Sequence, residues 1–122
     1  MQISLMTGDA QYRVTAISDQ QIRINDQSYQ QSLIVSPDAL ELWQVSQLSD
    51  LTPAEVTRLC QQYQPEVLLL GTGQRQQFPP VEILGAAANA GLSLEVMTTQ
   101  AACRTYAVLI SEGRRAVAAL IF

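Results

Sequence analysis

The chain has 122 residues, 48% of them hydrophobic and 15% charged, which suits one globular domain and excludes a disordered chain. Its net charge is −4, and all seven basic residues are arginines, because the sequence contains neither lysine nor histidine. This balance excludes non-specific nucleic-acid binding through a basic surface. The lack of histidine excludes Ser-His-Asp and Cys-His catalysis and histidine-ligated metal sites.

Two cysteines, Cys60 and Cys103, stand far apart and form no C-x-x-C motif. The sequence therefore predicts neither a zinc site nor a disulfide framework. No basic segment followed by an apolar one opens the chain, and no apolar run approaches the roughly 18 residues needed to span a bilayer. We therefore expect a soluble, cytoplasmic protein of a reducing compartment, with no cofactor, no metal and no membrane insertion.

The first third of the chain predicts an antiparallel β layer. Short segments rich in β-branched and aromatic residues alternate with turn-forming runs at residues 18–21 and 25–27. The pattern Ile22-Arg23-Ile24, a turn and then residues 27–29 is typical of a hairpin. Ser36 and Pro37 end the strand before them. The expected strands are residues 3–6, 12–17, 21–24, 27–29, 32–35 and 40–43.

The rest of the chain alternates helices and strands. Ser49 or Thr52 is expected to cap a helix that begins near Pro53, with Glu55 completing a capping box after Thr52. The inward stripe of this helix is expected to hold Val56, Leu59, Cys60 and Tyr63. Further on, the predicted strands are residues 67–70, 92–96 and 116–121, and the predicted helices are Val81–Asn89 and residues 99–112. This order predicts parallel strands with right-handed crossovers, and the lack of a linker predicts one domain over residues 1–122.

A dense block of residues near the C-terminus carries a family resemblance. The block contains Glu95, Met97, Thr99, Ala101, Ala102, Cys103, Arg104, Thr105, Tyr106, Leu109, Glu112, Arg114, Val117, Ala118, Ala119 and Leu120. Two shorter blocks are residues 69–73, LLGTG, and residues 32–37, SLIVSP. Together they resemble the small Mth-type domain family, a three-layer β/β/α domain of unknown function whose members include a mitochondrial respiratory complex I assembly factor.

The resemblance implies an α/β domain in which a β layer packs on a mixed sheet, with a βαβαβ C-terminal part. It also implies a non-enzymatic interaction or assembly role with a protein partner, which agrees with the missing histidine, metal ligands and paired acids. Glu66, Glu82 and Glu95 show no paired spacing. The chain departs from the family pattern at Thr98, where the family has aspartate, and at Ala107, where it has asparagine.

A second function is a small-anion or small-molecule site at the carboxyl ends of the parallel strands. Gly71, Thr72 and Gly73 follow one strand, and Thr98 and Thr99 follow the next and begin a helix whose N–H groups face the same edge. Two cations lie nearby, Arg75 and Arg104. The alternative is that the glycines only make a tight turn, since G-T-G is neither a dinucleotide fingerprint nor a phosphate loop.

Four further side chains each have more than one interpretation. Cys103, near a helix start and an arginine, is either a reactive thiolate or a small core residue. Arg104 is expected to be mostly buried, so it needs a carboxylate such as Glu112, several carbonyl oxygens or a bound anion. The aromatic residues Trp43 and Tyr29 belong either to a partner-binding patch or to the core.

Overall fold

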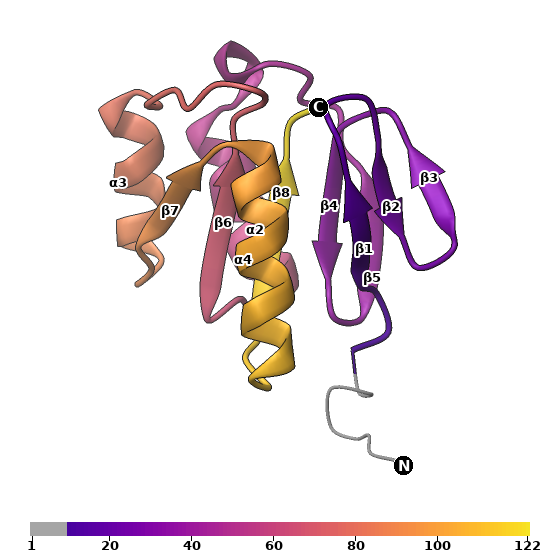
Figure 1. Ribbon diagram of the computed structural model, residues 1–122. Coiled ribbons are helices and arrows are strands. Elements are labelled where there is room, and N and C mark those ends of the chain that lie inside the picture. The colour runs from indigo at the N-terminus through magenta and orange to yellow at the C-terminus, as the bar shows by residue number, and fades with distance from the viewer. Residues whose placement is uncertain (1–9) are drawn as a thin grey trace.

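The computed structural model describes residues 10–122, which form two sheets and three α-helices (Figure 1). The small sheet is antiparallel, with the order β1 (Val14–Ile17), β2 (Ile22–Ile24) and β3 (Gln27–Tyr29). The large sheet has the order β5 (Ala39–Leu42), β4 (Leu33–Ser36), β8 (Ala116–Leu120), β6 (Val67–Gly71) and β7 (Leu94–Met97). The helices are α2 (Pro53–Tyr63), α3 (Val81–Asn89), α4 (Thr99–Ser111) and the short 3-10 helix η1 (Leu48–Asp50).

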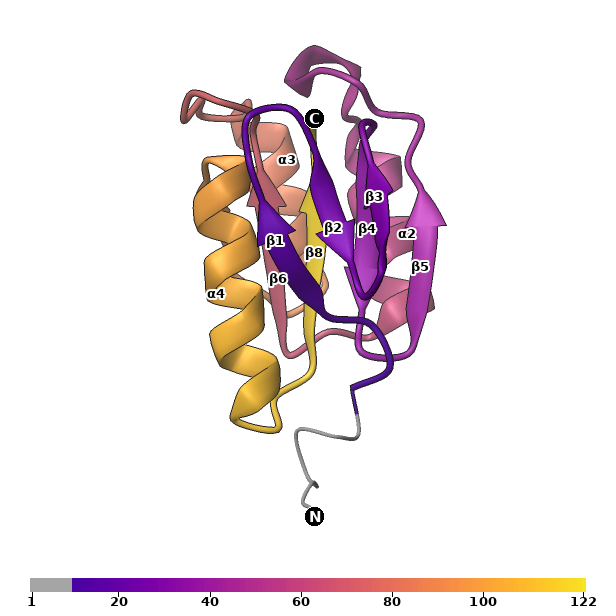
Figure 2. The same cartoon turned by 45° about the vertical axis from the view of Figure 1, so that its right-hand side comes forward.

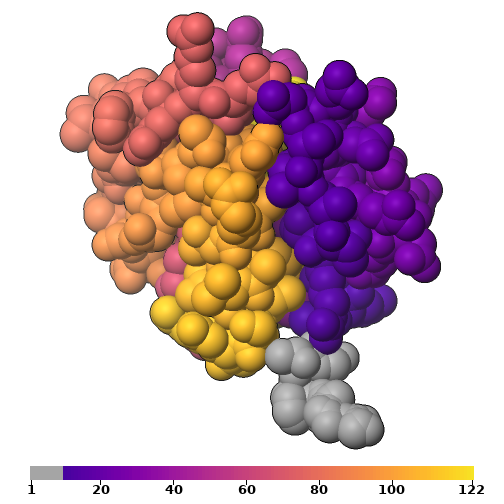
Figure 3. Space-filling model, viewed as in Figure 1, coloured from indigo at the N-terminus to yellow at the C-terminus, as the bar shows by residue number. Residues whose placement is uncertain are grey.

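The large sheet is covered on both faces, so its central strands are apolar throughout. All five residues of β8 are buried, and they alternate between two cores. Val117 and Ala119 face α2 and α3, whereas Ala118 and Leu120 face α4 and the small sheet. Figures 2 and 3 show that α4 and the small sheet lie side by side in one layer. The predicted β layer on a mixed sheet is confirmed, with α4 sharing the layer of the small sheet.

The parallel C-terminal part is also confirmed. Strand β6 pairs in parallel with both β7 and β8, and β8 occupies the centre of the sheet as its unbroken apolar run predicts. Strand β7 begins two residues later than predicted, because Gly91 adopts φ +83° and the Leu92 N–H bonds to the Ala87 carbonyl oxygen at the end of α3.

The antiparallel first third is only partly as predicted. Strands β4 and β5 leave the small sheet and join the large one, where β4 pairs antiparallel with β8 through Leu33 and Leu120. All four residues of β4 are buried, so this strand requires cover on both faces. The expected strand at residues 3–6 lies outside the described residues.

The start of α2 follows the sequence signals, except that the Glu55 carboxylate binds Trp43 and Arg58 and does not complete the predicted capping box. The Thr52 hydroxyl oxygen accepts the Glu55 N–H at 3.2 Å, and Pro53 is the first helical residue. Gln64 ends the helix in the left-handed conformation, with φ 48°. No helix within residues 10–122 is long and apolar enough to cross a membrane.

Candidate functional site

The loop after β6 meets the first residue of α4 in a close contact built around Thr99. The Thr99 hydroxyl accepts the Gly73 N–H at 2.9 Å and donates to the Ile121 carbonyl oxygen at 2.6 Å. The Thr99 N–H in turn donates to the Gly73 carbonyl oxygen at 2.9 Å. A Cβ atom at Gly71 would lie 2.9 Å from the Thr99 Cα, so only glycine permits this approach. Thr99 therefore joins the ends of β6, α4 and β8.

Thr72 organises the loop that follows. Its hydroxyl donates to the Arg75 carbonyl oxygen at 2.7 Å and accepts the Gln77 N–H at 3.2 Å. Gly73 adopts φ +103°, a conformation that favours glycine. The hydroxyls of Thr72 and Thr99 thus bond within the protein, as the tight-turn interpretation requires, and Arg75 is exposed in the same loop.

A hollow of about 280 Å³ lies beside this contact, and it brings together four of the eight predicted site residues. These are Gly73, Thr98, Thr99 and Arg104. The other four, Gly71, Thr72, Arg75 and Cys103, do not line it. The remaining lining residues are Ser18, Asp19, Gln74, Gln100, Ile121 and Phe122, which come from the β1–β2 turn, the β6 loop, α4 and the end of β8. Sequence reasoning missed the β1–β2 turn, because no local signal places it beside α4.

The electrostatics of the hollow are mixed. Arg104 is exposed, so the prediction that it is mostly buried was wrong. The buried face of α4 contains Ala102, Cys103 and Tyr106, and residue 104 is rotated about 100° from Cys103, which turns it away from the core. Within residues 10–122 no carboxylate pairs with the Arg104 guanidinium. On the opposite wall, Asp19 accepts the Gln100 Nε2 amide at 2.6 Å.

The departure at Thr98 does not remove the helix cap. The Thr98 hydroxyl accepts the Ala101 N–H at 3.2 Å, so it does what a capping aspartate would do but without the charge. Further along α4, Cys103 is 1% exposed, and burial raises the pKa of its thiol to about 12 against the opposing effect of the Arg104 charge. Cys103 is therefore a neutral, buried thiol, in agreement with the core interpretation.

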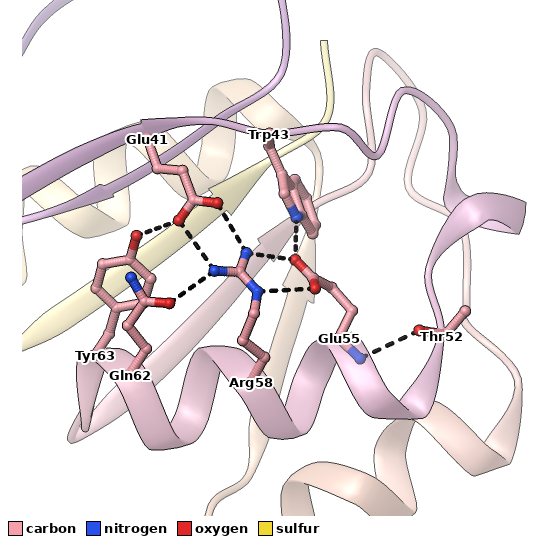
Figure 4. Close-up of polar contacts among 7 residues, drawn as sticks. All are labelled: Glu41, Trp43, Thr52, Glu55, Arg58, Gln62 and Tyr63. Carbon is pink, nitrogen blue, oxygen red and sulfur yellow. Dashed lines mark hydrogen bonds and ion pairs between the residues drawn. The ribbon is translucent and has the colours of Figure 1, made fainter.

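The structure also shows a polar cluster that the sequence did not predict (Figure 4). Arg58 of α2 lies between two carboxylates, with its Nη2 atom 2.9 Å from Glu41 Oε2 and 2.6 Å from Glu55 Oε2. The Trp43 indole N–H donates to Glu55 Oε2 at 2.7 Å, and the Tyr63 hydroxyl donates to Glu41. The cluster thus fastens strand β5 to helix α2.

The charges of this cluster are matched internally. Hydrogen bonds from Arg58 hold the pKa of Glu55 below its ordinary value, and hydrogen bonds to Glu55 and Glu41 raise the pKa of Arg58. Burial, followed by the Glu41 carboxylate, raises the pKa of Tyr63 to about 12. Since each charge has its partner, the cluster is an ion-pair network and offers no free acid, base or nucleophile. The Glu55-x-x-Arg58 spacing was its only local signal; Glu41 comes from a distant strand.

Burial decides between the interpretations of the two aromatic residues. Trp43 is 6% exposed and is held by Glu55, and Tyr29 packs half-buried against the core beneath the small sheet. Both belong to the core and not to a partner-binding patch. Among residues 10–122, no three cysteine, aspartate or glutamate side chains gather closely enough to hold a metal ion.

Two packed sheets, with the mixed one covered by α2 and α3, define a small α/β domain of the Mth938-like class. Residues 14–121 match the family described as proteins of unknown function DUF498/DUF598, and the chain belongs to this family. A solved structure from Xanthomonas campestris is 43% identical, with a TM-score of 0.81 over 99% of this chain and 92% of that one. One from Bordetella pertussis, described as a Mth938-like domain, is 29% identical with a TM-score of 0.80, over 99% of this chain and 92% of that one.

The curated relatives differ in their names. A Danio rerio protein named NADH dehydrogenase [ubiquinone] 1 alpha subcomplex assembly factor 3 is 34% identical over 93% of this chain and 75% of its own length. A Francisella tularensis protein named 13 kDa major membrane protein is 46% identical over 41% of each chain. The chain spans between 41% and 75% of the length of these two relatives.

Proposed function

We propose that this protein is a non-enzymatic interaction or assembly factor that binds a partner protein through the outer face of α3. One observation carries the proposal. Three large apolar side chains lie within seven residues of one another and are exposed: Phe78 at 81%, Val81 at 74% and Leu84 at 40%. A concentration of this kind differs from single exposed apolar residues, which are common on any protein surface.

The sequence of α3 accounts for this exposure. Ile83 and Ala87 bury the inner face of the helix against the sheet, while Val81 and Leu84 point outward. Glu82 is the one charged residue of α3, so the outer face of the helix has few polar groups that water can hydrate. Burying such side chains against a partner gains about 25 cal/mol for each Å² of apolar surface removed from water. The assembly-factor names of the curated relatives support the same role.

The test is capture of partners from the native cell with matched variants. The double variant Phe78→Ser/Leu84→Ser removes the apolar side chains, and Val108→Ser removes an exposed one on α4, where Val108 is 55% exposed. We expect a protein that is retained by the wild type and by Val108→Ser but lost from the double variant. A set of captured proteins that is the same for all three baits would refute the proposal.

A second candidate function is binding of a small anion in the hollow beside α4. The observation that favours it is the Arg104 guanidinium, which pairs with no carboxylate among residues 10–122 and lines the hollow together with Gly73, Thr98 and Thr99. Asp19 on the opposite wall weakens the attraction for an anion. Phosphate or sulfate should raise the melting temperature of the wild type but not of Arg104→Gln. Equal responses of the two proteins would contradict this candidate, and Arg75→Gln serves as the control.

A further inference from the structure

Within residues 10–122, no strand pairs with the outer edge of β7, and this edge lies next to the exposed face of α3. Strand β7 is the last strand of the large sheet, with β6 as its neighbour on one side (Figure 1). On the side of β6, the Thr72 N–H donates to the Met97 carbonyl oxygen at 2.9 Å. Successive carbonyls of a strand point to opposite edges, so the Val96 carbonyl points outward, where it accepts the Gln76 Nε2 amide at 3.2 Å.

This alternation also places the other backbone groups of the strand. The N–H and C=O of one residue in a strand lie on the same edge, so Val96 and Leu94 both present these groups outward. In the described part of the chain, the Gln76 amide is the single hydrogen-bond partner found on this outer edge. A strand edge of this kind is a ready template for another extended segment, and its free groups favour pairing.

The side chains along β7 define what the added segment must contain. Leu94 and Val96 face the core under α3, and the exposed Glu95 between them faces the other side of the sheet. Helix α3 directs Ala86 toward α2, so Leu84, two residues away and about 200° around the helix, lies on the flank away from α2. Figure 1 shows that α3 lies at the β7 end of the large sheet. A segment paired with β7 would therefore run beneath the apolar face of α3.

We propose that the partner binds by adding an extended strand to β7, with apolar side chains facing α3 and a lysine or arginine facing Glu95. This proposal rests on the proposed function and adds the form and chemistry of the partner. Residues directly opposite in neighbouring strands share a face of the sheet, so those opposite Leu94 and Val96 would pack against Leu84, while the one opposite Glu95 would meet a carboxylate. The alternation of apolar and basic residues follows from this register.

Charge favours a basic partner over a second copy of this chain. The chain carries a net charge of −4, and both charged side chains of α3 and β7, Glu82 and Glu95, are acidic. Antiparallel pairing of two β7 strands would place the two Glu95 carboxylates on one face of neighbouring strands, where like charges repel. The opposite edge of the sheet is β5, and its acidic side chain Glu41 is already paired with Arg58, so it does not offer a carboxylate to a basic partner in the same way.

The test is selection of binding peptides from a display library of random heptapeptides with the complete chain as target. We expect enriched peptides that alternate apolar residues with lysine or arginine. Val96→Pro removes the outward N–H and leaves the bonds to β6 in place, since proline is tolerated at a strand edge whose N–H faces solvent. It should weaken binding about tenfold, as should Leu84→Ser, whereas Leu42→Ser on β5 should not.

Glu95→Lys gives a second test that does not depend on how well the proline variant folds. It should reverse the preference of the selected peptides from basic to acidic residues. The proposal is overturned if no peptide is enriched over the bare support, if the enriched peptides lack the alternation, or if a folded Val96→Pro binds them as tightly as the wild type. A dimer in sedimentation velocity that Val96→Pro abolishes would overturn it in favour of a second copy.

The two proposals also fail separately. A cellular partner that is lost from Phe78→Ser/Leu84→Ser but retained by a folded Val96→Pro would overturn strand addition and leave the interaction role of α3 standing. A cellular partner that is retained by both variants would overturn both proposals.

Discussion

Replacing Gly71 with alanine tests the contact between β6 and α4 directly. The added Cβ would lie 2.9 Å from Thr99 Cα, 2.9 Å from Thr99 Oγ1 and 3.2 Å from Leu120 Cδ2. The Thr99 hydroxyl could rotate away, but the Cα is backbone and moves only if the first turn of α4 moves. Any such movement displaces the Thr99 hydroxyl from the Gly73 N–H and the Ile121 carbonyl oxygen.

The expected loss has two parts. Overpacking a well-packed core costs about 1–3 kcal/mol of unfolding free energy. Weakening each of the two Thr99 hydrogen bonds by about half adds about 1 kcal/mol in total. We therefore expect Gly71→Ala to lower the free energy of unfolding by about 2–4 kcal/mol. For a chain of this length the melting temperature should fall by about 10 °C.

Urea denaturation followed by circular dichroism measures this loss, with the m-value unchanged if the unfolded state is the same. Gly85→Ala is the matched control, because no atom lies within 4 Å of a Cβ at Gly85 in the middle of α3. Alanine there should stabilise the protein by about 0.5–1 kcal/mol, since it favours the helix. If Gly71→Ala stays within about 0.5 kcal/mol of the wild type, the close contact with Thr99 does not hold α4 in place.

Two further predictions concern buried and paired groups. In a Cys60→Ser background, Cys103 should react with a thiol reagent far more slowly than free cysteine does at pH 8, because burial raises the pKa of its thiol to about 12. Once urea unfolds the chain, Cys103 should react at the rate of free cysteine. Glu55→Gln should destabilise the protein at pH 7. The difference in the free energy of unfolding between the wild type and Glu55→Gln should narrow below about pH 4.5, because the pKa of Glu55 is lower in the folded protein than in the unfolded chain and the stabilisation from its charge is lost in acid. A difference that stays constant with pH would contradict this.

Local patterns predicted most elements of this chain. The N-cap signal at Thr52 gave the start of α2, and the apolar run near the C-terminus gave β8 as a central strand, because both signals depend on residues close in sequence. The same patterns could not assign β4 to a sheet. The pattern of a short apolar strand is the same in either sheet. The pairing of β4 with β8, which lies far along the chain, placed it in the large sheet.

The candidate sites divide in the same way. The sequence by itself determined the G-T-G loop and the start of α4, since each follows from residue type and local spacing. The tertiary structure alone decided that Arg104 faces solvent and that Asp19 lies across the hollow from it, because both depend on which face α4 turns to the sheet. It also decided that Glu41 meets Arg58 and that, within residues 10–122, β7 pairs only with β6, because contacts between distant segments are set by packing and not by local pattern.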